Sequence, residues 1–268
     1  MRKGGYDPAW AIFLAAVCSQ TYEQYNNKEG QFVVPFGYRT AFTVDATSFD
    51  RKRERFGFIL ESDRDIVVAF RGTSSTADWV SDALAYQIRY PYRDKAGQTH
   101  QGFTHIYRSA RARIVSALTS LPPDKPVYVA GHSLGGALAV LCALDLATLD
   151  SRRLLAAYTF GAPRTGDPGF ARAFNAAVRK SFRIANPYDA VAQLPPFILR
   201  MPGSKKTYYY SHVRGAVVLP FQNGSPAANH LIGSYFAALA ARDPAYAERL
   251  EADNPGFCPV RRTGKNRG

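Results

Sequence analysis

The chain has 268 residues, of which 46% are hydrophobic and 21% charged. This composition excludes global disorder, and the length suffices for a core without disulfides or a structural metal. The 34 Lys and Arg outnumber the 21 Asp and Glu and give a formal net charge of +13, which makes an anionic surface one candidate partner. Because the basic residues are mostly scattered, we interpret the charge as solvated surface and expect no nucleic acid and no obligate protein partner. We expect a single domain over residues 1–260 and a basic tail over 261–268.

The first predicted element is a helix from Pro8 to about Gln24. Asp7 is a helix-capping residue, and proline suits the first helical position. A signal peptide is the alternative interpretation of Arg2, Lys3 and the apolar run that follows, but a Gly-Gly-Tyr-Asp-Pro run interrupts that pattern. We therefore expect a structural helix and a cytoplasmic protein, with secretion left open.

Strands and helices alternate along the rest of the chain, which predicts one α/β unit with a mostly parallel sheet covered by helices. The expected strands span residues 56–61, 65–70, 127–130, 154–160 and 181–186, with strand or hairpin material over 208–219. The expected helices span residues 103–121, 134–149, 170–178 and 231–240. The charged residues 50–55 are expected to form a solvated loop.

A Gly-His-Ser-Leu-Gly run at residues 131–135 fits the G-x-S-x-G motif of a serine nucleophile. The context fits as well, since a buried strand precedes the run and an Ala- and Leu-rich helix follows it. On such a sharp turn the flanking glycines remove Cβ atoms that would clash. We predict Ser133 as the nucleophile and the backbone N–H of Leu134 as one oxyanion donor. The alternative is a Gly-rich turn that only closes a strand–helix unit.

A hydrolase of this design takes its second oxyanion donor from an earlier strand-to-helix loop. Arg71, Gly72 and Thr73 directly follow the strand expected over 65–70. Gly72 permits a close backbone approach, and Thr73 offers both an N–H and a hydroxyl. We predict Thr73 as the second donor and Arg71 as an ion-pair partner.

These motifs and two later runs together resemble the class 3 lipase family. The four runs are Phe-Arg-Gly-Thr at 70–73, Gly-His-Ser-Leu-Gly-Gly-Ala at 131–137, Tyr-Thr-Phe-Gly-Ala-Pro-Arg at 158–164 and Asn-Pro-Tyr-Asp at 186–189. The likeness extends roughly from Tyr6 to Ala240. It implies an α/β-hydrolase fold, a Ser-Asp-His triad and a mobile lid over the site.

The catalytic base must follow the nucleophile in the chain, because the triad order in these folds is Ser, then Asp or Glu, then His. Two candidates remain, His212 and His230. His212 follows a strand-like run, where a histidine is usually packed or hydrogen-bonded. His230 is expected in a loop just before a helix, where catalytic groups gather, and the family pattern places its histidine ahead of a helix with a tyrosine, as with Tyr235. We predict His230 as the base.

The candidates for the catalytic acid are the aspartates between nucleophile and base: Asp145, Asp150, Asp167 and Asp189. The first two belong to the helix after the nucleophile or to its end, and the third precedes a proline as a helix cap. Asp189 follows a strand in a Pro-containing turn and completes the Asn-Pro-Tyr-Asp run. We predict Asp189 as the acid, with an aspartate of an Asx-turn as the alternative.

Residues 74–84 follow the oxyanion loop and have one apolar and one polar side. By resemblance this segment is the lid, and Trp79, Val80 and Leu84 are its substrate-binding residues. The alternative is an ordinary surface helix with Trp79 in the core. The Pro-rich apolar run at 193–199 either lines an acyl pocket or fills a loop.

The predicted function is a serine carboxylic ester hydrolase, a lipase that cleaves acylglycerol esters through an acyl-enzyme and contacts a lipid interface transiently. It requires no metal or organic cofactor. A short-chain or feruloyl-type esterase is the alternative among enzymes. A catalytically silent α/β-hydrolase that binds its ligand is the alternative outside them.

Overall fold

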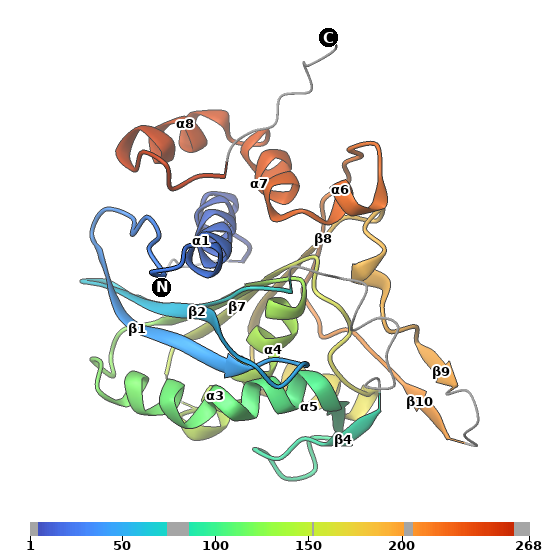
Figure 1. Ribbon diagram of the computed structural model, residues 1–268. Coiled ribbons are helices and arrows are strands. Elements are labelled where there is room, and N and C mark those ends of the chain that lie inside the picture. The colour runs from blue at the N-terminus through green and yellow to red at the C-terminus, as the bar shows by residue number, and fades with distance from the viewer. Residues whose placement is uncertain (1–4, 74–85, 152, 201–205, 260–268) are drawn as a thin grey trace.

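The computed structural model describes residues 5–73, 86–151, 153–200 and 206–259. A seven-stranded sheet lies at its centre, in the order β1-β2-β3-β6-β7-β8-β11 (Figure 1). Its strands are β1 (Tyr38–Thr47), β2 (Arg53–Ser62), β3 (Ile66–Phe70), β6 (Val127–His132), β7 (Leu155–Phe160), β8 (Lys180–Ala185) and β11 (Ala216–Val218). The pairs β1–β2 and β2–β3 are antiparallel, and the pairs from β3 to β11 are parallel. The predicted mostly parallel sheet is confirmed.

Helices cover both faces of this sheet (Figure 1). One layer contains α1 (Pro8–Asn26), α7 (Ile232–Ala240) and α8 (Pro244–Asp253), and the other contains α3 (Gln101–Thr119), α4 (Leu134–Leu149) and α5 (Pro168–Ala177). Each layer forms its own hydrophobic cluster with one face of the sheet. On β3, for example, Val67 packs toward α1 and Val68 toward α4, because side chains alternate along a strand.

The predicted start of α1 is confirmed. The Asp7 carboxylate accepts a hydrogen bond from the Trp10 backbone N–H at 3.1 Å, and Pro8 occupies the first helical position. The helix is buried on nearly all sides over its middle, because it lies between the sheet and α7. A helix in that position needs apolar residues around its whole circumference rather than along one stripe.

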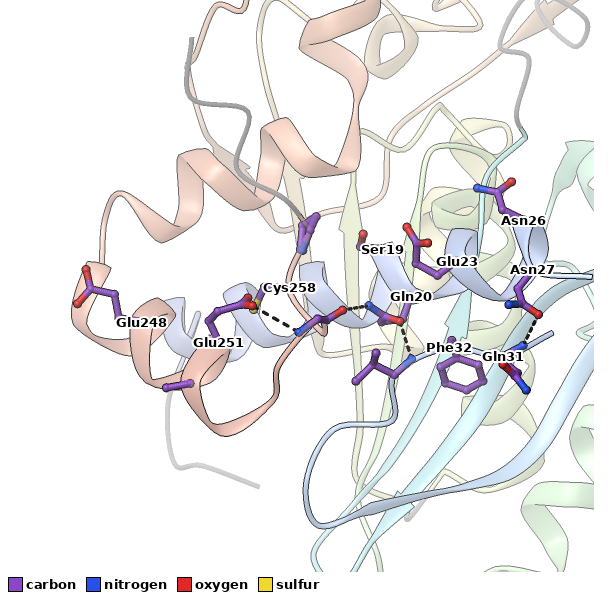
Figure 2. A pocket seen from close by; sticks show the side chains of 14 residues that line it. Ser19, Gln20, Glu23, Asn26, Asn27, Gln31, Phe32, Glu248, Glu251 and Cys258 are labelled. Atoms are coloured by element: carbon purple, nitrogen blue, oxygen red, sulfur yellow. Dashed lines mark hydrogen bonds between the residues drawn. The ribbon is translucent and has the colours of Figure 1, made fainter. Parts of the chain in front are cut away.

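The segment that follows α8 packs against α1 through Gln20. The Gln20 amide donates hydrogen bonds to the carbonyls of Gly256 and Phe257, and its oxygen accepts one from the Val33 N–H (Figure 2). A cavity of about 1220 Å³ lies here between α1, the loop after it and α8. None of its lining residues belongs to the four sequence runs singled out above.

The structure differs from the expected elements at several places. β2 begins at Arg53, so the expected loop over 50–55 is wrong for its last residues. β1, which pairs with β2 at the edge of the sheet, was not expected, and neither was α8 or the hairpin of β4 (Gln87–Arg89) and β5 (Gln98–His100). Charged side chains of an edge strand can point to solvent while the strand's backbone pairs with its neighbour. A polar run of residues therefore does not exclude a strand.

The stretch expected as strand or hairpin over 208–219 divides into two elements. β10 (Thr207–Tyr209) pairs with β9 (Ile198–Arg200) as a separate hairpin, whereas β11 joins the main sheet beside β8.

Among the described residues, no helix is long and apolar enough to cross a membrane. The basic tail over 261–268 lies outside the described residues, and the single domain over 1–260 stays a prediction.

Candidate active site

The turn from β6 into α4 carries Ser133. Its backbone has φ 57° and ψ −129°, a conformation that non-glycine residues rarely adopt. Glycines around it are required by packing, because a Cβ on Gly131 would collide with the Gly135 backbone, and one on Gly135 would collide with the carbonyl of Phe70. The predicted strand, sharp turn and helix are therefore all present, with Ser133 at the carboxyl edge of the parallel strands.

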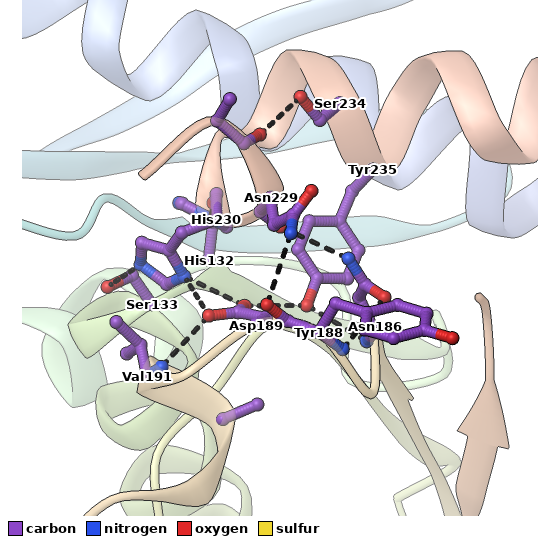
Figure 3. A network of polar contacts seen from close by, with 12 residues as sticks. His132, Ser133, Asn186, Tyr188, Asp189, Val191, Asn229, His230, Ser234 and Tyr235 are labelled. Carbon is purple, nitrogen blue, oxygen red and sulfur yellow. Dashed lines mark hydrogen bonds and ion pairs between the residues drawn. The ribbon is translucent and has the colours of Figure 1, made fainter. Parts of the chain in front are cut away.

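Ser133, His230 and Asp189 form one hydrogen-bonded chain (Figure 3). His230 Nε2 lies 2.8 Å from Ser133 Oγ, and His230 Nδ1 lies 2.8 Å from Asp189 Oδ2 and 3.0 Å from Oδ1. The three side chains are buried, with exposed fractions of 1%, 6% and 0%. A proton on Nδ1 directed at the carboxylate leaves Nε2 free to accept the serine proton, which is the arrangement a general base requires.

Two further donors hold the Asp189 carboxylate. The Val191 N–H donates to Oδ1 at 2.9 Å, and the Tyr235 hydroxyl donates to Oδ2 at 2.7 Å (Figure 3). Burial and the nearby carboxylate raise the pKa of Tyr235, so its hydroxyl keeps the proton that it donates. A Cβ on Gly161, whose φ is 56°, would lie 2.7 Å from Oδ2. The contact with the Val191 N–H is an Asx-type turn, which was the alternative role for Asp189. Asp189 makes this local contact and the contact with His230 at the same time.

The structure corrects the expected surroundings of His230. His230 is the last residue of the short helix α6 (Pro226–His230) and does not lie in a loop. Ser225 caps this helix by accepting a hydrogen bond from the Ala228 N–H at 3.1 Å, and Pro226 occupies the first position. A Ser-Pro start is a helix signal, and it predicts one turn here that the sequence analysis overlooked.

The loop after β3 lies against the nucleophile. A Cβ on Gly72 would lie 2.8 Å from Ser133 Cβ and 2.5 Å from Tyr22 Oη, so only glycine permits this approach. Thr73 is the next residue. Leu134 is the first residue of α4, and its N–H has no acceptor in an earlier helical turn. The two predicted oxyanion donors thus belong to segments that flank Ser133, and their role in catalysis stays a prediction.

A second hydrogen-bond chain, which the sequence analysis missed, joins the oxyanion loop to His230. The Gly72 N–H donates to Tyr22 Oη at 2.9 Å, Tyr22 Oη lies 2.7 Å from His132 Nδ1, and His132 Nε2 lies 2.7 Å from the His230 carbonyl oxygen. Because a carbonyl only accepts, Nε2 carries the proton and the Tyr22 hydroxyl donates to Nδ1. Burial, with a further electrostatic effect of the neighbouring His230 imidazole, lowers the pKa of His132 well below its ordinary value and keeps the ring neutral.

The other candidate residues lie apart from this chain. His212 Nε2 lies 2.9 Å from the Ala192 carbonyl oxygen, so the expectation of a packed, hydrogen-bonded histidine is confirmed. Arg71 forms the predicted ion pair, with Glu54 at 2.5 Å. Asp145 binds Arg111, and Asp167 caps α5 as expected. The lid residues Trp79, Val80 and Leu84 lie outside the described residues.

A model of the lipase (class 3) family matches residues 67–199, which include all four sequence runs. The chain belongs to the class 3 lipase family. The chain is 37% identical over 142 residues to a lipase of Rhizomucor miehei, a match that covers 51% of this chain and 39% of the relative. It is 28% identical over 291 positions to a phospholipase A1 of Oryza sativa subsp. indica, with 96% and 63% covered. The chain thus spans about half the length of these two relatives.

Solved structures of lipases share the fold. The native propeptide complex of Rhizomucor miehei lipase aligns with a TM-score of 0.61 at 25% identity and covers 75% of this chain and 71% of its own. A triacylglycerol lipase whose catalytic centre is a serine protease triad aligns with a TM-score of 0.58 at 26% identity, covering 70% and 74%. The predicted α/β-hydrolase fold is confirmed. Within the described part of the chain, no group of three or more His, Cys, Asp or Glu side chains could hold a metal ion.

Proposed function

We propose that the protein is a serine carboxylic ester hydrolase that releases fatty acids from acylglycerol esters. The observation that carries this proposal is the hydrogen-bonded chain from Ser133 through His230 to Asp189. The loop with Gly72 and Thr73 beside the nucleophile adds support, because acyl transfer needs donors for the oxyanion at that place.

In the proposed reaction, Ser133 Oγ attacks the ester carbonyl carbon while His230 Nε2 takes the serine proton. The N–H groups of Thr73 and Leu134, with the positive end of α4, stabilise the tetrahedral oxyanion. The bond to the alcohol oxygen then breaks, and His230 gives that oxygen its proton. A water molecule, deprotonated by His230, then attacks the carbonyl carbon of the acyl-enzyme. The bond to Ser133 Oγ breaks, His230 returns its proton to Oγ, and the fatty acid leaves. Asp189 holds the imidazole and stabilises its protonated form.

Apolar side chains beside the triad support a lipid substrate and transient contact with a lipid interface. Tyr188 and Leu231, which directly neighbour Asp189 and His230 in the chain, are each 51% exposed. Large exposed apolar side chains next to a site are typical of surfaces that meet lipid or another apolar partner. The names of the relatives, a lipase and a phospholipase A1, agree with glycerolipid esters as the substrate class.

The nucleophile and base are tested by substitution. Ser133→Ala and His230→Ala should each lower kcat on a soluble ester by about a thousandfold or more, because triad members act as a unit. His212→Ala is the matched histidine control and should keep most of the activity. A fluorophosphonate probe should label the wild type and leave Ser133→Ala unlabelled. More than about a tenth of the wild-type rate in Ser133→Ala would contradict the assignment, and an unlabelled wild type would favour a silent binding protein.

The substrate class is tested with p-nitrophenyl esters of increasing chain length, an emulsified glyceride and a phospholipid. We expect the highest rates on long-chain glycerolipid esters. Preference for short or feruloyl esters in solution would favour the esterase alternative.

The cytoplasmic location also stays a prediction, which fractionation of cells that express the chain would test.

A further inference from the structure

A small cavity lies beside the loop that carries the proposed catalytic acid. Its volume is about 220 Å³, and Arg183, His212, Asn186 and Gln193 line it together with apolar residues of β11. A water molecule takes up about 30 Å³ in the liquid, so the space suits a group several times larger. The cavity shares no lining residue with the Ser133 triad and lies beside β8 and β11, the last pair of strands in the sheet.

Arg183 reaches this cavity from the middle of β8. Its Nε atom is buried and has no hydrogen-bond partner among the described residues. Burial lowers the pKa of Arg183, and the nearby Arg164 guanidinium lowers it further. A guanidinium presents five N–H donors in a fixed fork. The half-buried guanidinium of Arg183 therefore has at least one donor, Nε–H, without an acceptor in the described part of the chain.

Two further basic groups lie close to Arg183. Arg164 donates to the backbone carbonyls of Gln193 and Pro195. His212 donates from Nε2 to the Ala192 carbonyl, which leaves Nδ1 as an acceptor, and burial with the two arginines lowers the pKa of His212 to about 3. In the described parts of the chain, neither arginine forms an ion pair with a carboxylate. No carboxylate of the described residues therefore pairs with the positive charge at the cavity.

We propose that the cavity binds an oxyanion of the phosphate type, held by the Arg183 guanidinium. The guanidinium fork matches two phosphate oxygens, and Arg164 adds positive potential behind it. Where the ligand is a phosphate or phosphomonoester that keeps one proton, His212 Nδ1 accepts the hydrogen bond of the protonated oxygen. Such an anion supplies an acceptor for the Arg183 guanidinium and a negative charge that the described residues do not provide at the cavity. The ligand is either a free phosphate or phosphomonoester, or the phosphodiester of a lipid headgroup.

Binding at this cavity is separate from ester hydrolysis, although Asn186 and Pro187 line the cavity and precede Asp189 in the same loop. The test therefore uses the full-length Ser133→Ala chain, which turns over no substrate. Calorimetric titration with inorganic phosphate, at constant ionic strength in chloride, should show saturable binding with one site. Arg183→Gln in the same background should lower the affinity at least tenfold, and His212→Gln should lower it severalfold.

Arg214→Gln is the matched control. Arg214 is an exposed arginine two residues from His212, and it does not line the cavity. Phosphate should also raise the Tm of the parent chain and of Arg214→Gln, but not that of Arg183→Gln. If Arg183→Gln does not fold, His212→Gln and Arg164→Gln carry the same comparison.

Two more titrations distinguish the sources of the anion. Binding of phosphate and glycerol phosphate but not of glycerophosphocholine assigns a free phosphate or monoester, whereas binding of glycerophosphocholine as well assigns a lipid headgroup. The absence of saturable binding for all three probes would overturn the proposal. Equal losses in Arg183→Gln and Arg214→Gln would also overturn it. Neither result bears on the proposed hydrolysis, which the Ser133 and His230 variants test.

Discussion

At the scale of single residues, the direction of each hydrogen bond around the triad follows from which atoms can donate. The His230 carbonyl must accept from His132 Nε2, so His132 Nδ1 must accept from the Tyr22 hydroxyl, whose oxygen accepts in turn from the Gly72 N–H. The oxyanion loop and the base are thus tied to one tyrosine of α1. We infer that Tyr22 is a positioning residue for both.

Removing the Tyr22 hydroxyl tests this inference. Tyr22→Phe leaves the Gly72 N–H and His132 Nδ1 without partners, so we expect kcat on a soluble ester to fall about 10- to 100-fold with little change in KM. The loss of a buried partner should also cost about 1–3 kcal/mol of stability. Tyr25→Phe is the control, because it retains the ring that stacks 3.7 Å from the Arg71 guanidinium. A purely structural role for Tyr22 would lower Tm and leave kcat of the folded fraction unchanged.

At the scale of elements, local patterns predicted the segments that place Ser133 and Asp189 but missed the short helix α6 that carries His230. The helix at Leu134–Leu149 was expected with its observed bounds, because glycines and a strand precede it and a long apolar run fills it. β1 was missed because it is half exposed and its residues do not alternate cleanly between apolar and polar. Nothing in the sequence near Tyr22 indicates its contact with His132, which is 110 positions away.

The segment over residues 74–84 carries a prediction of its own. If it is a lid that opens toward lipid, Trp79→Ala should reduce the rate on emulsified ester more than the rate on dissolved ester. Transfer of a large apolar side chain into lipid contributes about 1.5–3 kcal/mol, which suffices to bias a lid equilibrium of a few kcal/mol. The measurement is both rates across the solubility limit of one ester, for wild type and variant. Equal losses on the two forms would mean that Trp79 is a core residue.

At the scale of the whole molecule, the formal charge of +13 favours anionic interfaces. We expect the Ser133→Ala chain to sediment with vesicles that contain anionic lipid and less with neutral ones. Binding should weaken as salt rises, because charges are screened over about 10 Å at 0.1 M. Glycerophospholipid vesicles of both kinds, titrated at several salt concentrations, provide the measurement. Salt-independent binding to neutral and anionic vesicles alike would assign the attachment to the apolar side chains alone.

Acid should destabilise the whole fold through histidines that are buried in the neutral form. His100 is 0% exposed, and burial lowers its pKa to about 3. An unfolded histidine has a pKa of about 6.5, so between these values the unfolded chain binds a proton that the folded chain does not. This contribution is therefore complete above about pH 6.5 and is lost as the pH falls toward 3, with a slope of up to about 1.4 kcal/mol per pH unit.

His100→Asn isolates that contribution. His100 caps α3 by accepting a hydrogen bond from the Phe103 N–H at 3.3 Å, and asparagine can make the same cap without titrating. Urea unfolding at about pH 4, 5 and 6 should give a dependence of the unfolding free energy on pH that is shallower than wild type by about 1 kcal/mol per pH unit. His105→Asn, an exposed position on the same helix, should leave the dependence unchanged. The same slope in His100→Asn and wild type would mean that the folded protein accommodates a charged His100, contrary to its burial.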